Sequence, residues 1–201
     1  MSQAKSRDDA QAIAAVLHGD VDRYAELVEK YQDDALRLAF SLLGNSEDAK
    51  DVSQDAFVSA YRSLGRFRGG AKFSTWLYRI VVNKCHDVYK RRARQPMVVA
   101  SVGTPNPEVD PPGLFVDVED PTADPSDQAA NRELSRRLSL AIEGLPMKQR
   151  TAFVLHHVHG LALEEVATTM GCRVGTIKSH IFRATQQLHA RLTPLLAQEG
   201  V

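Results

Sequence analysis

The chain has 201 residues, of which 43% are hydrophobic and 25% charged, a balance that excludes wholesale disorder and suits a globular protein. The longest unbroken apolar run, 12–17, is far shorter than the roughly 20 residues of a membrane span, so no membrane insertion is expected. The N-terminus lacks the apolar segment of a secretory signal, and two distant cysteines, Cys85 and Cys172, form no disulfide framework. These features predict a cytoplasmic protein.

Charge is distributed in four blocks of alternating sign, although the net charge is zero. Residues 1–61 contain 6 Lys/Arg against 12 Asp/Glu, and residues 62–94 contain 10 against 1. Residues 95–131 contain 0 against 7, and residues 132–201 contain 9 against 5. Blocks of this kind indicate that the positive parts bind a polyanion. The alternative is that solvated helix faces happen to cluster.

The N-terminal half is predicted to be helical. After an N-terminal tail, 1–19, a domain over 20–94 has apolar residues at spacings of three and four. They predict helices at about 24–43, 46–64 and 73–94, with a glycine-containing loop before the last.

Seven of the nine prolines lie between Pro96 and Pro125, in an acidic stretch without helical or alternating periodicity. Residues 95–131 are therefore predicted to be a flexible linker. The domain beyond it, 132–197, contains predicted helices at about 132–143, 146–160, 163–170 and 174–191. The predicted fold is all-α: two helical domains joined by a long acidic Pro-rich linker, with a C-terminal helix-turn-helix.

The helix-turn-helix is predicted from the segment LEEVATTMGCRVGTIKSHIFRAT. Ala167 is small enough for two helices to cross, Gly171 tolerates the positive φ of a tight turn, and Ile177 anchors the second helix. A different side of that helix offers donors for base edges and phosphates, with Arg173 and Lys178 beside it. That side contains Thr176, Ser179, His180, Arg183 and Gln187. The alternative is an ordinary helical hairpin with a polar face.

A second candidate site mixes basic and aromatic residues. Within fourteen positions the chain has Arg66, Phe67, Arg68, Lys72, Phe73, Trp76, Tyr78 and Arg79. Cations follow phosphates and flat rings stack on unpaired bases. On the following helix Asn83 shares a face with Arg79, His86 and Lys90, and Asn is a natural bidentate partner of adenine. The alternative is that Phe73 and Trp76 are core aromatics.

A metal site is conceivable at His156, His157, His159 and Cys172, but the spacing matches no standard two-plus-two ligand pattern. The preferred interpretation is histidines at a helix C-terminus, where positive charge is favourable. The sequence contains no Gly-rich phosphate loop, nucleophile elbow or HExxH motif. No catalytic site, cofactor or metal is predicted, and the chain is not expected to be an enzyme.

The run NSEDAKDVSQDAFVSAYRSLGRFRGGAKFSTWLYRIVVNKCHDVYKRR, followed by LPMKQRTAFVLHHVHGLALEEVATTMGCRVGTIKSHIFRA, closely resembles the extracytoplasmic-function (ECF) group of bacterial RNA polymerase sigma factors. The resemblance covers about residues 20–94 and 132–190. It implies a subunit that binds core RNA polymerase and directs promoter-specific initiation, through recognition of −10 and −35 elements and strand opening.

The resemblance also implies residue roles. It assigns docking on core polymerase to an acidic helix with one exposed aromatic side chain. The residues of this surface are Asp48, Asp51, Gln54, Asp55 and Phe57. Binding of the −10 element falls to Arg66, Phe67, Arg68, Lys72, Trp76, Arg79, Asn83 and His86. Binding of the −35 element falls to Arg173, Thr176, Lys178, Ser179, His180 and Arg183. Many relatives carry a proline where Arg173 stands.

The implied partners are core RNA polymerase, promoter DNA and an anti-sigma factor, with the protein at the nucleoid when polymerase-bound. One alternative is a stand-alone helix-turn-helix repressor or activator. The acidic block beside a basic loop favours the sigma factor, because a repressor needs no polymerase-docking helix. A nucleic-acid-processing enzyme is disfavoured, since no carboxylate cluster or metal motif accompanies the basic segment.

Overall fold

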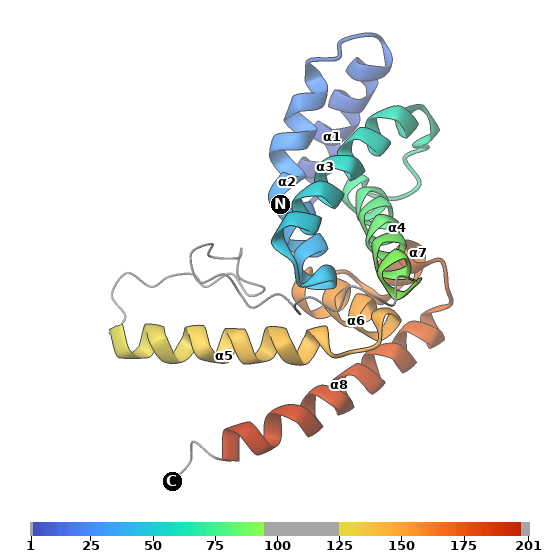
Figure 1. Ribbon diagram of the computed structural model, residues 1–201. Helices are drawn as coiled ribbons and strands as arrows, with labels where there is room; N and C mark the ends of the chain where they lie inside the picture. Colours follow the sequence, from blue (N-terminus) through green and yellow to red (C-terminus); the bar gives the residue numbers. More distant parts are fainter. Residues whose placement is uncertain (1, 95–124, 198–201) are drawn as a thin grey trace.

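A computed structural model describes residues 2–94 and 125–197 (Figure 1). Within these residues the chain is helical and contains no strand, which confirms the all-α prediction. The α-helices are α1 (Ser2–Leu17), α2 (Arg23–Leu43), α3 (Ser46–Ser63), α4 (Phe73–Arg94), α5 (Pro125–Glu143), α6 (Met147–Phe153), α7 (Leu163–Met170) and α8 (Val174–Ala197). A 3-10 turn, η1 (Leu64–Arg66), and a π-helical turn, η2 (Val154–Val158), complete the described chain. The predicted linker lies largely outside the described residues.

The N-terminal region is a bundle of α1 to α4. Helix α2 runs between its neighbours, and Leu27, Leu38 and Leu42 on its apolar face are at most 1% exposed. The helix ends at Gly44, which adopts a left-handed conformation with φ 68°. The Asn45 side chain then caps α3 by accepting a 2.9 Å hydrogen bond from the Asp48 backbone N–H. This cap fixes where the acidic helix begins.

Helix α1 lies where the sequence predicted a tail. Its residues Ala12, Ile13 and Val16 are buried in the core. The nearly buried Asp9 carboxylate accepts a hydrogen bond from the Tyr31 hydroxyl at 2.7 Å and one from the Lys30 ammonium. Burial and this carboxylate raise the pKa of Tyr31 well above its ordinary value. The helix depends on these tertiary contacts, which a sequence pattern does not display.

The C-terminal region differs from its prediction in two places. Helix α5 begins at Pro125, inside the segment predicted to be linker, because proline is well accommodated in the first turn of a helix. The helix predicted over 146–160 is α6 followed by the π-helical turn η2, which ends before Gly160. Gly160 has φ 66°, a conformation that favours glycine. The chain then enters α7 and α8.

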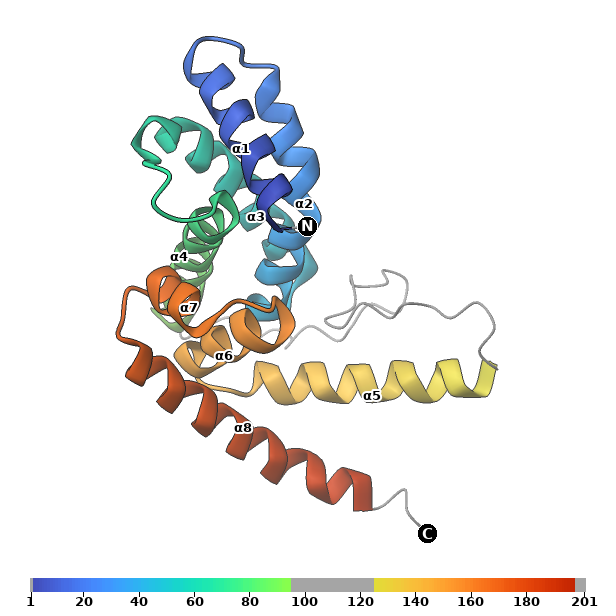
Figure 2. The same cartoon turned by 180° about the vertical axis from the view of Figure 1, so that it is seen from behind.

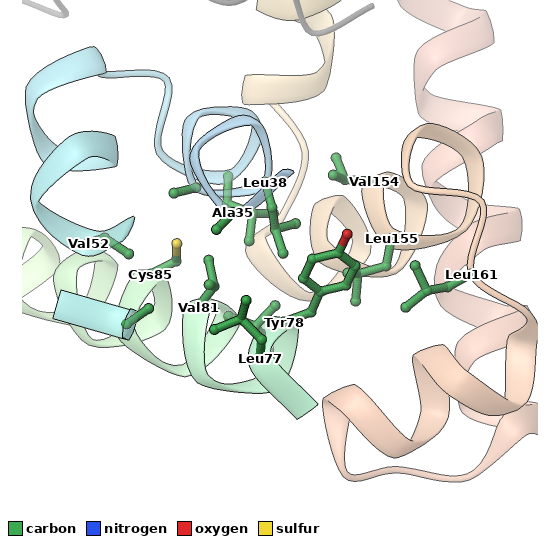
Figure 3. Close-up of a cluster of buried hydrophobic side chains, with 14 of the residues drawn as sticks. Ala35, Leu38, Val52, Leu77, Tyr78, Val81, Cys85, Val154, Leu155 and Leu161 are labelled. Carbon is green, nitrogen blue, oxygen red and sulfur yellow. The ribbon is translucent and has the colours of Figure 1, made fainter. Parts of the chain in front are cut away.

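The two regions pack against each other in both views (Figures 1 and 2): α6 lies against the C-terminal end of α2, α7 lies against the N-terminal part of α4, and α5 and α8 extend away. Buried apolar residues form a continuous cluster across this boundary. Figure 3 shows Tyr78 of α4 beside Leu155 of η2, with Leu38 and Val81 on the side away from Leu155. The described residues therefore share one core.

Candidate polymerase and nucleic-acid interfaces

Helices α7 and α8 form the predicted helix-turn-helix. Ala167, where the helices cross, is 7% exposed, and Ile177 is fully buried. Between the helices Gly171 adopts φ 63°, and the Cys172 N–H donates a 3.0 Å hydrogen bond to the Ala167 carbonyl. This turn leaves the long helix α8 with one buried and one open side.

The open side of α8 contains most of the predicted −35 residues. The exposed side chains there are Thr176, Lys178, Ser179 and Arg183, and Arg173, directly before the helix, is exposed as well. Phe182, which the sequence interpretation passed over, is the most exposed of the large hydrophobic residues in the described chain, at 62%. It lies one turn after Lys178, opposite the buried Ile177 and Ala184. The sequence could have indicated this exposure, because helical spacing places Phe182 on the side of α8 opposite its apolar stripe.

His180 and Gln187 lie to the side of this face. Both are half-buried, and Gln187 Nε2 donates a 3.2 Å hydrogen bond to Gln149 Oε1 of α6. The Nδ1 atom of His180 is buried. Burial, with Lys148 and Arg183 nearby, lowers the pKa of His180, which favours a neutral ring. Neither side chain belongs to the open side of α8.

The aromatic residues of the basic segment form a cluster. Phe73 is 2% exposed, and its ring centroid lies 5.9 Å from that of Phe67 and 5.7 Å from that of Trp76. Phe67 and Trp76 lie 5.3 Å apart and are only partly buried. The core interpretation therefore holds for Phe73. Phe67 and Trp76 each contact the cluster and remain partly accessible.

The polar residues of the basic segment fall into two groups. Arg66, Arg68, Arg79 and Asn83 are exposed. Lys72 and His86 contact the C-terminal region: Lys72 Nζ lies 2.9 Å from Glu165 Oε1, and His86 Nε2 lies 3.2 Å from Thr151 Oγ1. Burial and the nearby Lys90 lower the pKa of His86. Of these six predicted −10 residues, four are exposed, and Lys72 and His86 contact residues of the C-terminal region.

The acidic helix α3 presents Asp51, Gln54 and Asp55 to solvent. Asp55 pairs with Lys84 of α4 at 3.3 Å. Asp48 is half-buried and pairs with Arg92 near the end of α4. These bonds tie the acidic helix to the basic one.

Phe57 does not provide the exposed aromatic expected on this helix. It is 7% exposed, because its position falls on the edge of the stripe formed by Val52, Ala56 and Ala60. The apolar residue on the open side is Val58, which is 48% exposed. Phe57 and Val58 are adjacent in the sequence, so the sequence interpretation assigned the exposed apolar position to the wrong one of the two.

The histidines around the end of η2 have partners within the protein. His156 Nδ1 lies 2.8 Å from the Leu161 carbonyl oxygen, and His159 packs edge-on against Tyr78 at 5.5 Å between ring centroids. Among the described residues no group of three or more His, Cys, Asp or Glu side chains is placed to hold a metal ion. In the same part of the chain, no helix combines the length and apolarity needed to cross a membrane.

Comparison with known proteins places the chain in one family. The chain matches the models for Sigma-70 region 2 over residues 27–95 and Sigma-70 region 4 over residues 135–188. It is 36% identical to the RNA polymerase sigma-H factor of Pseudomonas aeruginosa, over 94% of this chain and 96% of the relative. It is 34% identical to the ECF RNA polymerase sigma-E factor of Escherichia coli K12, over 94% of this chain and 96% of the relative.

Solved structures show the same fold. CnrH in complex with the cytosolic domain of CnrY matches with a TM-score of 0.62 and 23% identity, covering 94% of this chain and 97% of that one. The sigma factor RpoE in complex with the anti-sigma factor NepR from Bartonella quintana matches with a TM-score of 0.61 and 24% identity, covering 84% and 97%. From its family matches and its near full-length relatives, the chain belongs to the ECF RNA polymerase sigma factors, which direct promoter-specific transcription initiation.

Proposed function

We propose that this sigma factor divides its work among three surfaces. The open side of α3 docks on core polymerase, the basic segment with α4 captures the −10 element, and the open side of α8 reads the −35 element. The observation that carries this proposal is their combination in one chain: an acidic helix tied to a basic helix, followed by a helix-turn-helix with an exposed polar face.

The docking surface is defined by Asp51, Gln54 and Asp55 with Val58 among them. Charged groups steer a partner and fix its register, while an exposed apolar side chain adds contact area. Asp48 has a different task, because its bond to Arg92 holds the end of α4 against α3. Phe57 supports the helix from inside the core.

The −10 surface is defined by the exposed Arg66, Arg68, Arg79 and Asn83, with Phe67 and Trp76 as partly open rings. Arginines bind the phosphates, and the rings offer faces for bases that have left the duplex. Asn83 lies one turn from Arg79 on the open side of α4, where its amide can pair with an adenine edge.

The −35 surface is defined by Thr176, Ser179, Phe182 and Arg183, with Arg173 and Lys178 at its margin. Arginine forms bidentate hydrogen bonds with guanine, and an apolar side chain such as Phe182 fits the methyl group of thymine. His180, half-buried beside α6, supports the position of α8 instead of reading bases.

The decisive experiment combines the purified chain with core polymerase on linear promoter templates and measures run-off transcripts. A sigma factor should bind duplex promoter DNA weakly alone, with strong salt dependence, because unpairing bases costs a few kcal/mol each. Adding core should produce specific transcripts. Tight binding of a duplex operator by the chain alone, with no new transcript on adding core, would favour the repressor instead.

We further propose a restraining anti-sigma partner, because RpoE of Bartonella quintana is solved with the anti-sigma factor NepR. The protein would act in the cytoplasm, at the nucleoid when bound to polymerase. It would contribute binding energy and no covalent chemistry. Co-purification of the tagged chain from its own host, before and after stress, tests for such a partner.

A further inference from the structure

Helix α1 carries a buried carboxylate that none of the three proposed surfaces uses. Asp9 is 5% exposed and lies on the same side of α1 as the buried Ile13 and Val16. A charged group among apolar side chains is costly unless it is hydrogen-bonded. Oδ2 of Asp9 accepts a 2.7 Å hydrogen bond from the Tyr31 hydroxyl, and Oδ1 accepts one from the Lys30 ammonium. The carboxylate therefore joins α1 to α2 at a defined point, the side chain of Tyr31.

The Tyr31 ring connects this carboxylate to the aromatic cluster of the −10 surface. Tyr31 is 9% exposed, and its ring centroid lies 5.5 Å from that of Phe73. Phe73 in turn contacts Phe67 and Trp76, the two rings that remain partly accessible. Protein interiors are close-packed, so a shift of one buried ring moves its neighbours. A continuous series of contacts thus runs from Asp9 to the rings that would stack on bases.

The other end of α1 reaches the chain on the far side of the same loop. Residues 67–72, here called the −10 loop, connect η1 to α4. Leu17 lies against η1, because a Cβ atom at Gly65 would be 3.9 Å from Leu17 Cδ2. Asp9 and Leu17 are about 12 Å apart along the helix axis. Helix α1, which packs along α2 (Figure 2), therefore contacts the chain before the −10 loop directly and the chain after it through Tyr31.

Fixed rings capture a strand better than mobile ones. Ordering one side chain on binding weakens affinity by about two- to ten-fold, so a ring whose orientation is set in advance binds a base more tightly. Phe67 and Trp76 are half-buried, and both contact the buried ring of Phe73. The position of Phe73 therefore helps to set the orientation of both.

We propose that Asp9 is a positioning residue for −10 strand capture: through Tyr31 and Phe73 it fixes the orientation of the two partly open rings. This role rests on the proposed function, because it concerns the rings of the −10 surface. Asp9 acts from the core, and the match to the Sigma-70 region 2 model begins after it, at residue 27. Its loss should weaken strand binding without changing the salt dependence of affinity, which reflects phosphate contacts.

The first test uses Trp76, the only tryptophan of the chain, as a fluorescent reporter. Asp9→Ala leaves the Tyr31 hydroxyl buried without its acceptor, a costly state that the ring relieves by moving. The Trp76 emission of the full chain should then shift to longer wavelength, and acrylamide should quench it more strongly. Asp8→Ala, at the neighbouring exposed residue, is the matched control and should leave both unaltered.

A second substitution distinguishes positioning of the rings from simple attachment of α1. Tyr31→Phe removes the hydroxyl, so the Asp9→Ala/Tyr31→Phe variant no longer contains that unsatisfied donor and keeps the ring. Its Trp76 emission should return towards the wild-type value, although the bonds of Asp9 to Tyr31 and Lys30 are gone. If Asp9 served only to attach α1, the double variant would keep the altered emission.

The next contact in the series is tested at Tyr31 itself. Tyr31→Leu keeps an apolar side chain but removes the ring beside Phe73, and it should alter the Trp76 emission as Asp9→Ala does. Tyr31→Phe keeps the ring and should not. Circular dichroism verifies that each variant keeps its helices. Because Tyr31→Leu leaves Asp9 with Lys30, it tests the proposal even if Asp9→Ala releases α1.

Strand capture is measured with holoenzyme, the chain bound to core polymerase, and a fluorescent single-stranded −10 oligonucleotide. Asp9→Ala and Tyr31→Leu should bind it about two- to ten-fold more weakly, with unchanged salt dependence. Val52→Ala controls for a general loss of stability, because it opens a cavity at a buried position of α3. Val52 lies about 16 Å along α3 from the end that leads to the −10 loop, so this variant should bind the strand as wild type does.

Unchanged Trp76 emission in Asp9→Ala, or unchanged strand affinity in Tyr31→Leu, would overturn the positioning role. An Asp9→Ala/Tyr31→Phe variant that binds as weakly as Asp9→Ala, or an equal loss in Val52→Ala, would overturn it as well. A scrambled oligonucleotide separates the two proposals. Equal preference for the −10 sequence in wild type and Asp9→Ala keeps the −10 surface and removes the positioning role, whereas a wild-type holoenzyme without that preference removes both.

Discussion

Arg150 Nη1 donates a 2.6 Å hydrogen bond to the carbonyl oxygen of Leu42, although 108 positions separate the two residues. The same guanidinium donates to the carbonyl of Glu143, and to that of Leu145 at 3.3 Å. The carbonyls that end a helix lack intrahelical partners, and positive charge is favourable there. One nearly buried arginine therefore caps α2 and α5 together, one helix from each region.

Arg150→Met should destabilise the protein by about 3 kcal/mol, because buried carbonyls lose charge-assisted hydrogen bonds. Urea unfolding followed by circular dichroism measures the loss. Arg191 provides the control, since it also binds carbonyls at the end of α5 from an exposed position: that of Ala141 and that of Gly144, directly after the helix, both at 2.9 Å. Arg191→Met should cost less than about 1 kcal/mol, because water replaces its bonds. Equal losses would contradict the capping role of Arg150.

Reversing both Asp51 and Asp55 to Lys should abolish assembly with core polymerase, because the docking surface would then repel its partner. Gel filtration with core measures co-elution, and the thermal midpoint checks the fold. Glu29→Lys with Asp33→Lys is the control, an exposed pair at the same spacing on α2. Co-elution of the Asp51/Asp55 variant with core polymerase at the wild-type level would contradict the proposal that α3 is the docking helix.

Arg183→Ala should weaken binding of holoenzyme to a matched −35 element by about 1–3 kcal/mol, and leave scrambled DNA nearly unaffected. Lys178→Ala should weaken both by a smaller, equal amount, because a phosphate contact carries no sequence information. Electrophoretic competition between the two templates measures the ratio. His180→Ala should change that ratio least, given its half-buried position. Equal losses on both DNAs for Arg183→Ala would refute its role as a reader.

Asn83→Ala should lower strand opening more than closed-complex binding, because its amide pairs with a base edge that is accessible only after melting. Permanganate reactivity of unpaired thymines measures opening, and filter binding in the cold measures closed complexes. Lys90→Ala, an exposed phosphate-type residue on the same helix, should lower both steps together. If Asn83→Ala lowers both equally, Asn83 contacts the duplex backbone instead.

The contact between the two regions should weaken in mild acid. Burial lowers the pKa of His159 to about 4, while Asp34 raises it and Arg37 lowers it by smaller amounts. Between that value and the ordinary pKa near 6.5, an exposed histidine binds more protons than the buried one. Stability of the contact is therefore full above about pH 6.5 and falls towards pH 4, by up to about 3 kcal/mol.

Energy transfer between two dyes, one in each region, checks this dependence when it is recorded from neutral pH downwards. The dyes are attached at the exposed positions His18→Cys and Ala190→Cys in a Cys172→Ser background. His86, His157 and His180 also have lowered pKa values, so the informative quantity is the difference between wild type and His159→Phe. The variant should lose most of the acid-induced opening. A variant that opens with the same midpoint and amplitude would assign the effect to another group.

Periodicity predicted the helices α2, α3, α4, α7 and α8 because each buries an apolar stripe at helical spacing. It missed α1, whose burial rests on contacts with α2 such as Asp9 with Tyr31. The sequence interpretation placed the start of α5 in the linker, because proline usually marks the end of a helix. Proline is nevertheless well tolerated in the first turn of a helix, where α5 has Pro125. Local patterns do not contain the distant partners that decide such segments.

The site residues divide in the same way. Exposure of Asp51, Arg79 and Arg183 follows from helical phase, and the sequence interpretation placed them on open faces. Phe57 was expected outside and is buried, whereas Val58 and Phe182 are open. Lys72 and His86 were assigned to DNA, and only the packed structure reveals their partners Glu165 and Thr151. The sequence pattern of one region does not show which of its residues contact the other region.

The early start of α5 sets a limit on promoter spacing. Helix α4 ends at Arg94 and α5 begins at Pro125, so the tether between them has 30 residues. It cannot span more than about 110 Å, even fully extended. Each base pair added between the elements lengthens the required span by about 3.4 Å. The residue at which α5 begins therefore sets an upper limit on the distance between the end of α4 and the C-terminal region, and with it on the promoter spacing that the chain can bind.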